Sequence, residues 1–187
     1  AGSPDPHGHM PECPKRGSTP EPFALVAKTA ATTLRLLVDL PFDYPDDEYR
    51  RFALSLGYAL RAGMRHLYML DGSEIEVEIE PCFPVEDDAG RRKRAAITFI
   101  DPALGGTGFL ERAASEMHRV AARAMEHLDH ADCESACYRC LKSYQNQRYH
   151  SLLSWPHAMP ALAALAEKAP VRRDVHGDDR ERLRAWI

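Results

Sequence analysis

The chain has 187 residues, of which 44% are hydrophobic and 28% are charged, and its formal net charge is −4. This composition is typical of a globular protein that buries a core of its own. The acidic balance argues against a protein that wraps nucleic acid over its whole surface, although a local basic patch is compatible with it. No apolar run approaches the roughly 20 residues of a membrane-spanning helix, and the first residues lack a signal-peptide pattern.

The N-terminal stretches are expected to lie outside the folded part. The opening AGSPDPHGHM resembles the remnant of a tag, which suggests that the chain is a piece of a larger protein. Residues 11–22 are rich in proline and polar residues, as linkers are. We therefore expect a tag remnant and disordered linker over residues 1–22, an α+β domain over 23–129, and a metal-binding segment with C-terminal helices over 130–187.

The first half of the chain predicts strands around one long helix. The stretch TLRLLVDL, from Thr33 to Leu40, is typical of a strand. A helical period of apolar residues begins at Asp46 and continues to Leu67. The stretch DGSEIEVEIE alternates, and so predicts a half-buried strand with an acidic outer face. The residues DDAGRRKR predict a hairpin tip, and the apolar AAITFI, from Ala95 to Ile100, predicts a central strand.

The second half predicts helices around a cysteine cluster. A glycine-rich turn, DPALGGTG, leads into an amphipathic helix expected from Phe109 to Leu128, and another helix is expected from Pro156 to Lys168. The order strand, helix, hairpin, helix predicts an α+β fold. We expect a small mixed or antiparallel sheet covered by helices, with the cysteine cluster in a C-terminal subdomain.

The stretch CESACYRC holds three of the five cysteines of the chain. An odd number of clustered cysteines is untypical of a secreted disulfide framework, and favours a metal site in a reducing cytoplasm. Cys137 and Cys140 form a C-x-x-C knuckle, whose turn lets two thiolates share one ion, and Cys133 supplies a third sulfur. These spacings predict a structural zinc ion.

A fourth ligand must come from elsewhere in the chain. We expect His150, which requires residues 141–149 to be irregular, because a continuous helix would put it about 15 Å along the axis from Cys140. His130, Asp132 and Cys82 are the alternatives.

The cluster has two other interpretations. The spacing C-x-x-x-C-x-x-C also holds the four-iron cluster of radical S-adenosylmethionine enzymes, but those enzymes carry it early, before a barrel. Fewer than 50 residues follow Cys140 here, too few for that barrel. Three unliganded core cysteines are the remaining interpretation, and their polar neighbours argue against it.

Together, DPALGGTGFLE, the long helix and CESACYRCLKSYQNQRYHSLLSW resemble the MrfA-type zinc-binding domain, over roughly residues 23–168. This family lies C-terminal to superfamily 2 helicase cores in DNA-repair helicases, and occurs in phage-defence proteins such as those of DISARM systems. The resemblance implies a zinc-binding accessory domain that braces a helicase motor, or a helicase partner subunit, and contacts DNA. The chain has no G-x-x-x-x-G-K-[ST] loop, so ATP hydrolysis is expected outside it.

The sequence departs from the family pattern at two places. Ala131 stands where many members have the first cysteine of a C-x-C pair, so one metal ligand of that pattern is absent. Leu153, Ser154 and Trp155 stand where many members have Leu-Asp-Arg or Leu-Asp-Lys, so an ion pair carried by those charges is missing.

The glycine-rich turn has two interpretations. Its glycines and the free amides at the start of the following helix could bind a phosphate group. A tight structural turn that packs the helix against the sheet is the interpretation we favour. The residues concerned are Asp101, Gly105, Gly106 and Gly108.

The basic side chains near the predicted hairpin are candidates for contact with a nucleic-acid backbone. The candidates are Arg91, Arg92, Lys93 and Arg94, with Lys142 and Arg148 beside the cysteine cluster. A solvated hairpin tip is the alternative. Tyr138, Tyr144 and Tyr149 could stack on bases or pack the metal subdomain.

No catalytic constellation is present in the sequence, and we expect no catalytic residue. The function expected is therefore a non-catalytic accessory domain. A fragment of an iron–sulfur enzyme and a pure protein-docking module are the alternatives.

Overall fold

The computed structural model describes residues 6, 10–14, 16–17, 30–88, 90–128, 130 and 132–167. Most of the predicted tag remnant and linker lies outside these residues, as do Ala131, Lys168 and the charged C-terminal stretch. Within the described part of the chain, no helix is long and apolar enough to cross a membrane.

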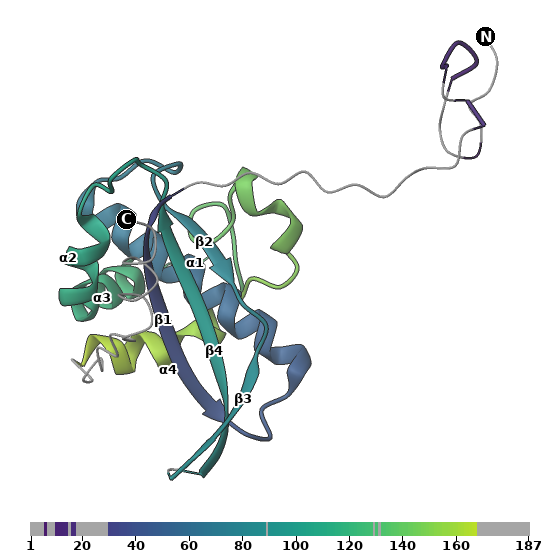
Figure 1. The fold of residues 1–187 in the computed structure, drawn as a ribbon. Coiled ribbons are helices and arrows are strands. Elements are labelled where there is room, and N and C mark those ends of the chain that lie inside the picture. Colours follow the sequence, from purple (N-terminus) through teal and green to yellow (C-terminus); the bar gives the residue numbers. More distant parts are fainter. Residues whose placement is uncertain are drawn as a thin grey trace, which may run out of the picture.

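Four antiparallel strands form one sheet around a long central strand (Figure 1). The central strand, β4, pairs with β1 along one side and with β2 and β3 along the other. Its buried middle contains the predicted stretch Ala95–Ile100, so the prediction of a central strand is confirmed. The strands are β1 (Thr32–Pro41), β2 (Glu76–Ile79), β3 (Phe83–Asp87) and β4 (Gly90–Asp101).

In the view of Figure 1, α1 passes behind the sheet, and α2 and α3 lie to the left of β1. The longest, α1, contacts β2 and β4, and it also packs against α3 and α4. The predicted α+β fold is thereby confirmed. The helices are α1 (Asp46–Tyr68), α2 (Phe109–Ser115), α3 (Met117–Leu128) and α4 (Trp155–Ala166), with a short 3₁₀ helix, η1 (Tyr144–Tyr149), after the cysteines.

Alternation along β4 explains why helices cover one face of the sheet. Ala95, Ile97 and Phe99 point to the same face because side chains alternate along a strand, and all three are fully buried in the core. On the opposite face Thr98 lies beside Glu80, whose carboxylate also pairs with Arg35 of β1. The polar face of the sheet therefore carries charged side chains, whereas the helices cover its apolar face.

Gly63 permits a close crossing of α1 and α3. A Cβ atom at this position would meet the carbonyl oxygen of Val120, and would come within 3.0 Å of the Cβ atom of Ala124. The crossing places the C-terminal half of α1 beside the end of α3, where the chain enters the cysteine cluster.

Two features differ from the sequence-based expectations. The helix expected from Phe109 to Leu128 is interrupted at Glu116, whose φ of −111° and ψ of 24° end α2. The Ser115 hydroxyl donates to the carbonyl of Glu111, a local bond that competes with helix continuation. The basic residues expected at a hairpin tip lie within β4, because the unpredicted strand β3 pairs with them.

Candidate metal centre

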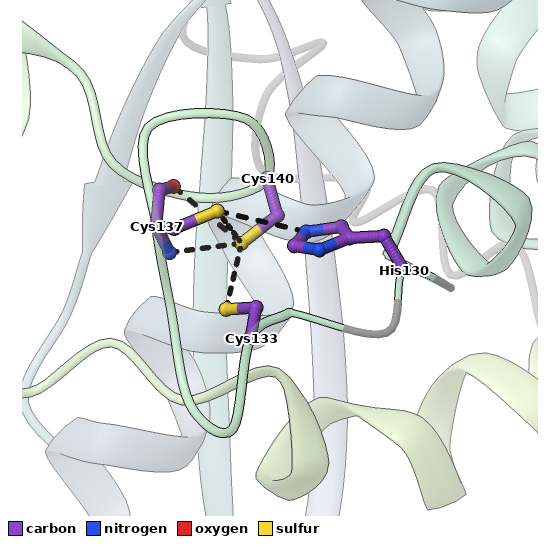
Figure 2. A group of neighbouring side chains, drawn as sticks. All are labelled: His130, Cys133, Cys137 and Cys140. Atoms are coloured by element: carbon purple, nitrogen blue, oxygen red, sulfur yellow. Dashed lines mark hydrogen bonds between the residues drawn. The ribbon is translucent and has the colours of Figure 1, made fainter.

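The cysteine cluster lies in the loop between α3 and α4 and brings four ligand atoms together. His130 precedes the three cysteines, and its ring points toward their sulfur atoms (Figure 2). The ligand atoms of His130, Cys133, Cys137 and Cys140 all lie within 4.8 Å of one another. Three sulfurs and one imidazole nitrogen are a typical donor set of structural zinc sites.

Three of the six distances between these atoms match a tetrahedron around zinc. The Sγ atom of Cys140 lies 3.8 Å from that of Cys133 and 3.7 Å from that of Cys137. Tetrahedral zinc with bonds of about 2.3 Å to sulfur separates two sulfurs by about 3.8 Å, and sulfur from nitrogen by about 3.6 Å. Nε2 of His130 lies 3.6 Å from Sγ of Cys137, in agreement with the second value.

The backbone of the knuckle is folded around the cysteine sulfurs. The carbonyl of Cys137 accepts hydrogen bonds from the amides of Cys140, Leu141 and Lys142, at 3.2, 3.1 and 2.9 Å. The amide of Cys137 in turn points at Sγ of Cys140, 3.1 Å away. Amides directed at sulfur stabilise a thiolate, which is the form that binds metal.

The two thiols of the knuckle are perturbed in opposite directions. Burial raises the pKa of Cys140 to about 11. Burial also acts to raise the pKa of Cys137, but the Arg139 amide and the Cys140 side chain outweigh it and hold this pKa below its ordinary value. A buried thiolate needs a compensating cation, which a zinc ion would supply.

His130 fits the fourth position. Its Nε2 faces the sulfurs, whereas its Nδ1 is buried and has no hydrogen-bond partner among the described residues. The second ring nitrogen of a metal ligand usually has a polar partner of its own, so it is the direction of Nε2 toward the sulfurs, 3.6 Å from Sγ of Cys137, that places His130 at the fourth position. The residues present therefore fit zinc.

His150, the first expectation for the fourth ligand, lies outside this group. Its Nε2 is 3.0 Å from the carbonyl oxygen of Ser143 and 3.0 Å from Oδ1 of the fully buried Asn146. The segment before it is irregular, as that expectation required, but the 3₁₀ turn of η1 directs the ring to the loop backbone.

The other two alternatives also have different neighbours. The Asp132 carboxylate pairs with Arg139 at 3.1 Å, and Cys82 lines a separate pocket with Tyr49. The sequence does contain a signal for His130. Its spacing to Cys133, H-x-x-C, equals the spacing of the C-x-x-C knuckle.

Side chains that depart from the family pattern hold the loop against the helices. The indole Nε1 of Trp155 donates to the carbonyl of Cys133 at 2.9 Å, and its amide donates to the carbonyl of Ser135 at 2.9 Å. The amide of Ser154 donates to the buried hydroxyl of Ser55 on α1 at 2.8 Å. Neutral hydrogen bonds therefore hold the loop at positions where the resemblance would have placed an ion pair.

The glycine-rich turn is closed by Asp101. The buried carboxylate accepts bonds from the amide of Ala103 at 3.0 Å, and from the amide and hydroxyl of Thr107 at 2.6 and 2.7 Å. Gly106 has a φ of +72°, and a Cβ atom there would collide with Thr32. These contacts support the structural interpretation of the turn, because two of its amides already have an anionic acceptor.

The basic residues of β4 have acidic partners. Asp39 accepts from Arg92 at 2.8 Å and from Arg94 at 2.6 Å, and Lys93 lies 2.5 Å from the carboxylate of Asp46. Arg91 lies over the ring of Phe42 and 3.6 Å from Glu86. Lys142 and Arg148 line two other pockets, and each of these pockets also includes Arg61.

The comparisons with known proteins bear on the same segment. Residues 56–141 match the family model of the MrfA Zn-binding domain, and this range contains His130 and all three clustered cysteines. Over these residues the chain is similar to the MrfA Zn-binding domain. The predicted resemblance is therefore confirmed, and so is the prediction that zinc is the cofactor of this segment.

Comparison of whole proteins adds one structure. None of the curated proteins matches the chain. The chain resembles part of the crystal structure of the DUF1998 helicase MrfA bound to DNA, with 15% sequence identity and a TM-score of 0.47. The likeness covers 68% of this chain and 15% of that one, so the chain spans a small part of the length of that helicase.

Proposed function

We propose that the chain is a non-catalytic accessory domain of a helicase-type DNA-processing protein, in which His130, Cys133, Cys137 and Cys140 hold a structural zinc ion. The observation that carries this proposal is the closed donor set, in which four protein ligand atoms lie within 4.8 Å of one another. Catalytic zinc sites keep one position open for water or substrate, whereas structural sites fill all four with side chains.

The zinc ion would stabilise a loop that has little core of its own. Between the end of α3 and the start of α4, few hydrophobic side chains are buried, and two of them are the metal-binding cysteines Cys133 and Cys140. Such a segment gains much of its folding free energy from the metal. Zinc binding would thereby fix α4 relative to α1 and α3.

We further propose that this rigid unit braces helicase motor domains, or a helicase partner subunit, in the cytoplasm. The match to the MrfA Zn-binding domain supports the association with a helicase. ATP hydrolysis would belong to the motor, and DNA repair and phage defence are the two settings in which we expect such a protein to act. Binding of DNA by this domain is a separate part of the proposal.

Elemental analysis and an ATPase assay of the 187-residue chain test the central claim. We expect one zinc ion per chain, no iron, and no ATP hydrolysis with or without DNA. Iron in the purified protein would favour the iron–sulfur alternative, and ATP turnover free of contaminants would contradict the accessory role.

A further inference from the structure

A pocket of about 230 Å³ lies directly beside the metal centre. It is bounded by the C-terminal half of α1, the end of α3 and the C-x-x-C knuckle, and Cys140 forms part of its wall. Among the described residues that line it, none is acidic and six carry cationic or imidazole groups. These six are Arg61, Arg65, His66, His127, Arg139 and Lys142.

Arg61 is fixed in this pocket by neutral groups. Its side chain is almost fully buried, and it donates to the carbonyls of Ile75, at 2.8 Å, and Gly72, and to the amide oxygen of Gln145, at 2.8 Å. These acceptors orient the guanidinium without neutralising it. Burial, and then the charge of the neighbouring Arg65, lower the pKa of Arg61, whereas Tyr58 and Glu76 act in the opposite direction.

Arg65 lies one turn further along α1 and has an unpartnered polar atom. Its Nε is buried and finds no hydrogen-bond acceptor among the described residues. Neither Arg65 nor Lys142 takes part in an ion pair within the part of the chain that the structure describes. A buried guanidinium nitrogen without an acceptor is costly, so the site favours an incoming anion.

The contrast with β4 shows that this surplus of charge is local. Arg94 on β4 has its pKa raised by the hydrogen bond to Asp39, as expected for a compensated guanidinium. Arg139, at the rim of the pocket, shares its charge with Asp132, 3.1 Å away. The uncompensated cations of the pocket are therefore Arg61, Arg65 and Lys142.

We propose that this pocket binds a phosphate group of a nucleic-acid strand that passes the zinc knuckle, with Arg65 and Lys142 as its ligands. The site rests on the proposed function, since it assigns the DNA contact of the accessory domain to one place. Arginine offers a planar fork of donors that matches phosphate oxygens, and lysine adds a point charge.

Tyr138 provides the surface on which a base of that strand stacks. It belongs to the knuckle, lines the same pocket, and is 68% exposed although it is a large aromatic residue. The His150 ring packs against it edge to face, with the ring centroids 5.4 Å apart, and holds its orientation. A cationic groove next to an exposed aromatic ring is the usual arrangement for binding single strands.

Fluorescence anisotropy with the 187-residue chain and a labelled single-stranded oligonucleotide of about 12 nucleotides tests the site. We expect the double variant Arg65→Gln, Lys142→Gln to bind about tenfold more weakly, and its affinity to depend less steeply on salt, because phosphate contacts are lost. The matched control is Arg119→Gln, on the exposed side of α3 and paired with Glu116, which should bind like the wild type. Unchanged binding by the double variant would overturn the proposal.

Two further measurements separate a strand from a free phosphate. We expect Tyr138→Ala to weaken oligonucleotide binding about fivefold or more, since stacking contributes to each bound base, and to leave inorganic phosphate binding unchanged in calorimetry. Equal affinity for inorganic phosphate and the oligonucleotide, with no effect of Tyr138→Ala, would show a free-phosphate site and overturn the proposal.

If Arg65→Gln lowers the zinc content, the single variant Lys142→Gln tests the phosphate site by itself, because Lys142 is only half buried. One zinc per chain with no oligonucleotide binding would refute this pocket and leave the accessory role standing.

Discussion

His130 and His150 flank the cysteine cluster in the sequence, and of these two only His130 has its imidazole beside the sulfurs. Each histidine has a different task in the loop. His130 directs Nε2 at the sulfur of Cys137, whereas His150 uses Nε2 for the carbonyl of Ser143 and the side chain of Asn146. The two residues therefore form a natural pair of test and control.

We predict that His130→Ala lowers the zinc affinity by about 100-fold or more, because one of four ligands is lost from the site. His150→Ala should retain one zinc ion per chain and lose only about 1 kcal/mol of folding stability with its hydrogen bonds. Competition with a chromophoric chelator measures both affinities. Loss of zinc from the His150 variant alone would return the fourth position to His150.

The cysteines allow a parallel prediction. Cys137→Ser should expel the zinc ion, because serine replaces a thiolate ligand by a hydroxyl that stays protonated. Cys82→Ser is the control, since Cys82 lines a pocket with Tyr49 away from the cluster. Equal zinc content in the two variants, measured by elemental analysis, would remove Cys137 from the site.

Asp101 gives a prediction with a defined pH dependence. Burial alone would raise the pKa of Asp101, but the amide and hydroxyl of Thr107 and the amide of Ala103 lower it below the ordinary value of 3.8. Because the folded-state pKa is lowered, the carboxylate stabilises the fold above about pH 4, and this stabilisation is lost as the pH falls through the folded-state value.

The variant Asp101→Asn should therefore lower the free energy of unfolding by about 1–3 kcal/mol at pH 7, through lost charged hydrogen bonds. The difference from the wild type should shrink as the pH falls below about 4. Asp43→Asn, in the exposed turn before α1, should have little effect at either pH. Chemical denaturation at several pH values measures these differences, and a constant difference across them would argue against an ionised Asp101 in the turn.

At the scale of elements, the crossing of α1 and α3 depends on Gly63. Gly63→Ala should destabilise the fold by about 1–3 kcal/mol, because the added methyl group meets the backbone carbonyl of Val120, which cannot rotate away. This cost should exceed the gain of about 1 kcal/mol that alanine brings to a helix. Gly72→Ala is the control, because its Cβ atom would lie 3.8 Å from the nearest atom, on Arg65. Thermal unfolding that ranks the two variants in the opposite order would contradict the close crossing.

Most elements could be predicted from the sequence because their apolar periods are long. The helix from Asp46 shows a clear apolar period of 3.6 residues, and the strand containing Ala95–Ile100 shows a continuous apolar run. The structure has both elements. The strand β3 could not be predicted in this way. It has only five residues, with Pro84 and two acidic side chains among them, and its existence depends on pairing with distant residues of β4.

The site was predictable in part for a similar reason. The local spacing of the three cysteines is enough to predict them as metal ligands. The choice between the two histidines depends on the path of the chain after the cluster. The basic residues illustrate the same limit. Their charge is visible in the sequence, but their neutralisation by Asp39 and Asp46 arises only when β1 and the start of α1 are folded against β4.

At the scale of the whole molecule, the zinc loop and the sheet are stabilised by different means. The sheet and α1 share a core of fully buried side chains such as Leu56, Ile97 and Phe99. The loop after α3 relies on the metal ligands and on bonds such as that from Trp155 to the carbonyl of Cys133. Loss of zinc should therefore loosen the loop without unfolding the sheet.

Hydrogen–deuterium exchange with a zinc chelator tests this division between a domain over residues 23–129 and a zinc-binding segment over 130–187. The amides of Cys140, Leu141 and Lys142 donate to one knuckle carbonyl, and we expect them to exchange about 100-fold faster or more once the metal is removed. Amides of β4 around Ile97 should keep their protection, because their strand partners and core contacts do not involve zinc. Chelator saturated beforehand with zinc is the control and should change neither region. Simultaneous loss of protection in the loop and in β4 would show instead that the zinc loop and the sheet unfold as one cooperative unit.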